Sequence, residues 1–208
     1  MSKNEYNLSS VKRFVAAVEN ERLLAAKTII GKIKDINATC IYISKEGRSY
    51  SFLTALLLLS MDESLRQDVV QYFLECAENL DVNKSFDYTH NNYEYTFTPL
   101  SYAVMMAKTD DEYRGLVATL LAHDGLNRQH SKNAEAFVLA CANDDISMYH
   151  LLTDKGVDQH FIWQDIEQTF VSSEHYYNPR YLYVDDDNIL HVMLPFARGA
   201  WENQLGII

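Results

Sequence analysis

The stretch Asn133–Asp158, NAEAFVLACANDDISMYHLLTDKGVD, decides how the rest of the chain is interpreted. Its apolar residues form two short sets, 137–141 and 146–152, that suit two helices. The turn Asn143-Asp144-Asp145 between them can cap a following helix, and Gly156 tolerates the left-handed backbone that ends one. Neither helix is long enough to be stable alone in water, so we expect each to bury its apolar face against a neighbour.

Further units of this kind occur along the chain, and the clearest begins at Thr98. Residues 98–103 read TPLSYA, which differs from the T-P-L-H-x-A opening of an ankyrin repeat only at Ser101. The chain therefore resembles the ankyrin-repeat family. This resemblance implies an all-α fold, a solenoid of about five helix-pair repeats, each with an inner and an outer helix, whose connections form extended β-hairpin or loop fingers. The expected units of this single domain, residues 1–208, are 11–37, 51–83, 98–127, 135–158 and 188–208, with insertions at 84–97 and 159–187. Most units lack the Thr-Pro pair, so a helix-pair solenoid of another family is the alternative.

Two connections between units have the pattern of a β-hairpin. Residues 38–51 place apolar side chains on both sides of a Glu46-Gly47 turn, which predicts a short hairpin. Residues 84–97 alternate aromatic and polar side chains on both sides of His90-Asn91-Asn92, which predicts a longer one.

The last insertion and the last unit carry an acidic segment. We expect an amphipathic helix over 161–171 and then a last inner helix opening at residues 188–192, NILHV, which resembles a degenerate T-P-L-H. Between them, His175, Asp185–Asp187 and His191 bring together residue types that bind metals. We interpret the three Asp residues as a turn that caps the last helix, because carboxylates are favoured at helix N-termini. No metal site is predicted.

Tyrosine is concentrated in the connections, which the resemblance places on the concave face. Tyr offers a large contact area at a low entropy cost and is enriched in protein-binding surfaces. We therefore predict a partner-binding set of finger residues with an acidic rim: Tyr88, Tyr93, Tyr95, Trp163, Tyr176, Tyr177, Tyr181, Asp185, Asp186 and Asp187. The alternative is that about half of these rings pack inward to order the fingers.

Composition narrows the classes of partner and activity. The formal net charge is -11, from 29 acidic and 18 basic residues, which disfavours nucleic acid because phosphate binding depends on Lys and Arg. No segment has the length and apolarity of a membrane span, and residues 1–10 lack the pattern of a secretory signal. No nucleotide-binding or catalytic signature is found, so neither a cofactor nor catalytic residues are predicted.

The sequence thus predicts a non-enzymatic module that binds another protein on a Tyr-rich finger face, with a monomer favoured. We expect a cytoplasmic regulator, or a bacterial effector delivered into a host cell. The alternative is the N-terminal targeting domain of a larger enzyme. It is motivated by residues 201–208, WENQLGII, which look like an outer helix stopped midway.

Overall fold

The computed structural model describes residues 8–43, 48–63, 67–90, 93–107, 112–142, 145–157, 161–162, 182–184 and 189–192. Its helices come in consecutive pairs: α1 (Leu8–Glu19) and α2 (Leu23–Ile30), α3 (Phe52–Glu63) and α4 (Gln67–Cys76), α5 (Pro99–Met106) and α6 (Glu112–Ala122), α7 (Ser131–Ala142) and α8 (Ile146–Asp154). Each pair falls at one of the first four expected units, with some helices starting earlier than the sequence pattern suggests.

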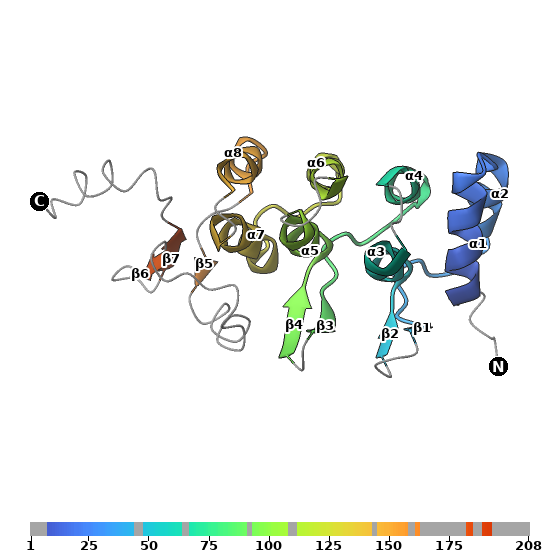
Figure 1. The fold of residues 1–208 in the computed structure, drawn as a ribbon, viewed down its shortest axis with the longest axis horizontal. Helices are drawn as coiled ribbons and strands as arrows, with labels where there is room; N and C mark the ends of the chain where they lie inside the picture. Colours follow the sequence, from blue (N-terminus) through green and yellow to red (C-terminus); the bar gives the residue numbers. More distant parts are fainter. Residues whose placement is uncertain are drawn as a thin grey trace, which may run out of the picture.

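Helices α3 to α8 form two layers (Figure 1). In one layer α3, α5 and α7 lie side by side, and in the other α4, α6 and α8 do so. One cluster of buried apolar side chains extends through the helices from Val11 to Val157. Because helices as short as the 8-residue α5 are marginal alone, this shared core is what stabilises them.

The first helix pair is turned relative to the others. Figure 1 shows α1 and α2 from the side, whereas α3 to α8 are seen end-on. Helix α1 contacts both α3 and α4, and the ring centroid of its fully buried Phe14 is 5.8 Å from Phe52 and 5.6 Å from Phe73. Helix α1 therefore closes the apolar end of the two layers.

The start of α5 shows how TPLSYA begins a helix with Ser101 in place of His. The Thr98 hydroxyl accepts a hydrogen bond from Ser101 N at 3.2 Å, and Thr98 N donates to the Ser101 hydroxyl at 2.9 Å. This reciprocal capping box satisfies two backbone donors at a site where both residues are fully buried. Pro99 follows at the first helical position, where an N–H is not needed.

The ends of α8 also follow the sequence pattern. Asp145 caps the helix by accepting from Met148 N at 2.9 Å, and it forms an ion pair with Arg114 of α6. Gly156 follows the helix with φ +70°, in the left-handed region that glycine adopts without strain.

Two β-hairpins project from the α3–α5–α7 layer, away from the other layer (Figure 1). The first pairs β1 (Ile41–Ile43) with β2 (Arg48–Tyr50), and the second pairs β3 (Phe86–His90) with β4 (Tyr93–Phe97), both antiparallel. Both hairpins lie where the sequence pattern predicts them.

Asparagine side chains join consecutive units in a repeated way. Asn37 and Asn83 each accept from a backbone N–H and donate to a backbone carbonyl in the loop that follows the next helix pair. The four hydrogen bonds are all 2.8 Å long and join Asn37 Nδ2 to Asn79 O, Asp81 N to Asn37 Oδ1, Asn83 Nδ2 to Gly125 O, and Asn127 N to Asn83 Oδ1. Each asparagine thus joins the segment after one helix pair to the loop after the next.

The C-terminal part differs from the expectation. Strands β5 (Phe161–Ile162), β6 (Leu182–Val184) and β7 (Ile189–Val192) form an antiparallel sheet in which β7 is central. The predicted helix starts at 161 and 189 are therefore wrong, and the proposed Asp cap at 185–187 has no helix at 189–192 to cap. A short apolar run such as ILHV suits a strand as well as a helix, and here pairing on both edges decides for the strand.

Candidate functional site

Of the predicted contact residues, the structure describes the side chains of only Tyr88 and Tyr95. The ring of Tyr95 is buried and Tyr88 is half-buried, both packed against the core. Tyr93 pairs with His90 at the end of the second hairpin, and its side chain lies outside the described residues. The others also lie outside the described residues: Trp163, Tyr176, Tyr177, Tyr181, Asp185, Asp186 and Asp187.

The aromatic rings of the second hairpin attach it to α5. Tyr102 of α5 is fully buried, and the ring centroids of Phe86, Tyr88 and Phe97 lie 5.4, 5.9 and 5.8 Å from its own. Tyr95 stacks on Phe97 at 5.8 Å. Such edge and stacked contacts add to the apolar burial, so these rings order the hairpin. The role predicted for Tyr95 as an exposed contact residue is therefore corrected to packing.

A cleft of about 340 Å³ lies at the base of the two hairpins, beside the start of α3. Its lining combines two cations, one carboxylate, five serine or threonine side chains and two aromatic rings: Arg48, Lys84, Asp87, Thr39, Ser49, Ser51, Thr54, Ser85, Tyr50 and Phe86. This volume falls at the lower end of the range of about 300 to 1,000 Å³ that is usual for ligand pockets. The cleft is thus large enough to receive side chains of a binding partner.

The charged groups of the cleft come from different elements. Arg48 of β2 forms an ion pair with Asp87 of β3 at 3.7 Å, so the pair links the two hairpins. Lys84 Nζ donates to the backbone carbonyl of Asn37 at 2.6 Å. Both cations are therefore positioned by contacts with the neighbouring unit.

The hydroxyls of the cleft fall into two groups. Ser51 and Thr54 are buried, and their oxygens lie 2.9 Å apart at the start of α3. Thr39, Ser49 and Ser85 are exposed. Only the second group can meet a partner from solvent.

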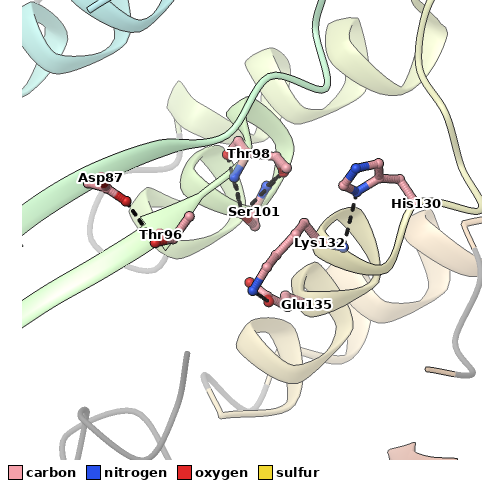
Figure 2. Close-up of polar contacts among 7 residues, drawn as sticks. All are labelled: Asp87, Thr96, Thr98, Ser101, His130, Lys132 and Glu135. Carbon is pink, nitrogen blue, oxygen red and sulfur yellow. Dashed lines mark hydrogen bonds and ion pairs between the residues drawn. The ribbon is translucent and has the colours of Figure 1, made fainter. Parts of the chain in front are cut away.

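Polar contacts occur on the second hairpin and close to it on α5 and α7 (Figure 2). Figure 2 shows Thr96 donating to Asp87 across the hairpin at 2.8 Å, close to the Thr98–Ser101 capping box. On α7, Lys132 forms an ion pair with the buried carboxylate of Glu135 at 2.8 Å. Burial of a carboxylate is costly without a cation, so Lys132 offsets the cost of burying the charge of Glu135 within α7.

Two further grooves lie beside the outer helices. One, of about 650 Å³, runs between the ends of α2 and α4 and includes Lys27 and Glu78. The other, of about 630 Å³, runs between α4 and α6 and includes Gln71 and Ala118. Grooves are the ordinary result of packing neighbouring helices, and these two are not flanked by hairpins.

Among the described residues that line the cleft between the hairpins there is no histidine or cysteine, and Lys84 donates to a backbone carbonyl. In the described part of the chain, no group of three His, Cys, Asp or Glu side chains is placed to hold a metal ion. None of the described helices combines the length and apolarity needed to cross a bilayer.

A sequence feature other than tyrosine content points to the residues that line the cleft. In a strongly acidic chain, each hairpin region contains a cation followed by a serine, Arg48-Ser49 and Lys84-Ser85. The structure brings these two dipeptides to one cleft.

Comparison with known proteins adds no relative: no protein-family model, curated protein sequence or solved structure matches this chain.

Proposed function

We propose that this chain is a non-enzymatic protein-binding module of ankyrin-like architecture, and that its partner docks on the hairpin side of the helix layers. The observation that carries the proposal is the cleft between two hairpins that project from the same layer. The aromatic cluster around Tyr102 attaches the second hairpin to α5, so its polar edge is held in place before a partner arrives. Pre-ordering of this kind lowers the entropy cost of binding.

The ankyrin-like assignment is supported by the helix pairs, the capping box at Thr98 and the repeated asparagine contacts between units. Helix pairs that contact mainly their neighbours are typical of repeat proteins. A binding role agrees with the lining of the cleft, which presents exposed hydroxyls and charged groups that can pair with polar groups of a partner.

The test compares two matched double substitutions in the full chain. Ser49→Tyr with Ser85→Tyr fills the cleft from two exposed positions, whereas Gln71→Tyr with Ala118→Tyr changes two exposed positions of the α4–α6 groove. Proteins captured from lysates of the source cell are compared by quantitative mass spectrometry. We expect a saturable partner that the second variant retains and the first loses. Loss with the groove variant alone, or no saturable partner, would contradict the proposal.

A further inference from the structure

The cleft carries a local charge opposite to that of the whole chain. The chain has a formal net charge of -11, yet two cations, Arg48 and Lys84, and one carboxylate, Asp87, line the cleft. Local charges at short range decide which group a cleft accepts, while the charge of the whole molecule acts over longer distances and is screened by salt. The cleft therefore favours an anionic group.

Arg48 brings a guanidinium to the cleft. Its guanidinium is a planar fork of N–H donors that matches the two oxygens of a carboxylate. The ion pair to Asp87 spans 3.7 Å, longer than the 2.7 to 2.9 Å of a short charge-assisted hydrogen bond. The Asp87 contact is therefore an electrostatic one rather than a short hydrogen bond, and it holds the positive charge of Arg48 at the cleft.

Lys84 is the second cation of the cleft, and a hydrogen bond to the backbone positions it. Its Nζ donates to Asn37 O at 2.6 Å, and Asn37 is itself bonded to the loop after α4 through Asn79 and Asp81. An ammonium has three N–H donors, so one bond to Asn37 positions the charge without using its full capacity.

We propose that this cleft binds an acidic side chain of a peptide segment in the partner, an inference that rests on the proposed protein-binding function. Arg48 and Lys84 bind the carboxylate, and the exposed hydroxyls of Ser49 and Ser85 donate to its remaining lone pairs. A nucleic acid does not suit this site, because the many phosphates of a nucleic acid strand would meet the net negative charge of the chain.

Asp87 limits the affinity of the site. It lies beside Arg48 and is 61% exposed, and it accepts a hydrogen bond from Thr96 at 2.8 Å. An incoming carboxylate must approach this like charge. Replacing Asp87 by Asn removes the charge and keeps the oxygen that Thr96 uses, so affinity for an acidic probe rises.

The experiment titrates the full ¹⁵N-labelled chain with a blocked peptide, Gly-Ser-Glu-Glu-Ser-Gly, and follows the backbone amide signals. The amides of residues 48–50 and 84–87 are expected to shift saturably, and the peptide with Gln-Gln in place of Glu-Glu is expected to cause no such shift. A phosphoserine peptide of the same length tests whether the anionic group comes from a carboxylate or a phosphorylated side chain. Saturable binding of the phosphoserine peptide alone would overturn the carboxylate assignment.

Substitutions in the cleft test whether the peptide binds there. Arg48→Gln and Lys84→Gln should each weaken binding of the Glu-Glu peptide about five- to tenfold, and Asp87→Asn should tighten it about two- to fivefold. Lys27→Gln with Lys34→Gln removes two charges from the groove between α2 and α4 and should leave the affinity unchanged. Equal loss with this control would mean unspecific attraction and would overturn the site. If Arg48→Gln lowers thermal stability, Lys84→Gln decides the result.

The two proposals fail in different ways. Capture of a partner that is lost with the cleft-filling pair but unaffected by Arg48→Gln and Lys84→Gln would leave the protein-binding function standing and overturn the acidic-peptide assignment. Absence of any captured partner would contradict the function, while the peptide titration would still test the chemistry of the cleft.

Discussion

Asn37 and Asn83 make the same two side-chain contacts one unit apart, each bonding a backbone carbonyl and a backbone N–H of the following loop. Asn83 also accepts from Asn133 Nδ2 at 3.0 Å, which extends the link toward α7. A single side chain thus satisfies groups from two neighbouring units.

Asn83→Ala should lower the free energy of unfolding by about 2 kcal/mol, because it removes three hydrogen bonds that are each worth about 0.5 to 1.5 kcal/mol and are partly exposed. Urea denaturation followed by circular dichroism measures the change. Asn20→Ala is the matched control, since Asn20 bonds only the carbonyl of Ala16 among the hydrogen bonds described for it. An equal effect of both substitutions would contradict a special role of Asn83 between units.

Tyr95→Ala should destabilise the fold by about 3 kcal/mol, because its buried ring stacks on Phe97 and its removal leaves a cavity. Ser49→Ala, at an exposed position of the other hairpin, should change stability by less than about 0.5 kcal/mol. Thermal unfolding of both variants tests the packing role. An unchanged melting temperature for Tyr95→Ala would return this ring to the candidate contact surface.

Tyr72 links α4 to α2, since its hydroxyl donates to Leu23 O at 3.1 Å. Burial, then a hydrogen bond with Cys76, then the charges of Cys76 and Glu75 raise the pKa of Tyr72 from 10.0 to about 12. The folded state therefore holds this proton more tightly than the unfolded state. The resulting stability is present below about pH 10 and is lost as the pH rises toward 12.

Tyr72→Phe should be less stable than the wild type at neutral pH by about 1 kcal/mol, because it lacks the hydroxyl that donates to Leu23. The difference should shrink between about pH 10 and pH 12, since only the wild type loses the contribution of this proton. Melting temperatures of both proteins across this range give the comparison. A difference that stays constant with pH would contradict the raised pKa.

At the scale of elements, the packing of α1 against α3 and α4 depends on one large side chain, Phe14. Phe14 is fully buried among Phe52, Phe73 and Tyr72, where α1 lies beside α3 and α4 at the end of the two layers (Figure 1). Phe14 thus contacts aromatic side chains of both α3 and α4, so this one ring joins α1 to both layers.

Phe14→Ala should reduce stability by about 4 kcal/mol, and Phe14→Leu by less than about 1.5 kcal/mol, because leucine refills most of the volume. Chemical denaturation of the two variants gives both values. If Phe14→Ala costs no more than a surface substitution, α1 does not close the end of the layers.

The elements that the sequence predicts well are those specified locally. The capping residues Thr98 and Asp145 and the stop at Gly156 act within one turn of the chain, so the helix pairs and both hairpins are predictable. Strand β7 is not, because its partners at 161–162 and 182–184 lie far away in sequence. Alternation separates the two faces of a hairpin without saying which one packs on α5, so the sequence does not predict that Tyr95 is buried.

At the scale of the whole molecule, the two layers of described helices place both hairpins on the same side (Figure 1). The candidate site needs that arrangement, because Arg48 and Lys84 are 36 positions apart and meet only when neighbouring units lie side by side. No local pattern predicts such a meeting. The net charge of the whole chain, -11, does not predict a cationic cleft, because the cleft has more cations than carboxylates.

Site-specific photocrosslinking tests the central claim most directly. A benzophenone amino acid replaces exposed Ser49, Ser85 or, on the opposite side, Ala118 of the full chain in its source cell. We predict that Ser49 and Ser85 give the same covalent adduct with one partner protein and that Ala118 does not. An adduct formed only from Ala118, with none from the two cleft positions, would contradict docking on the hairpin side.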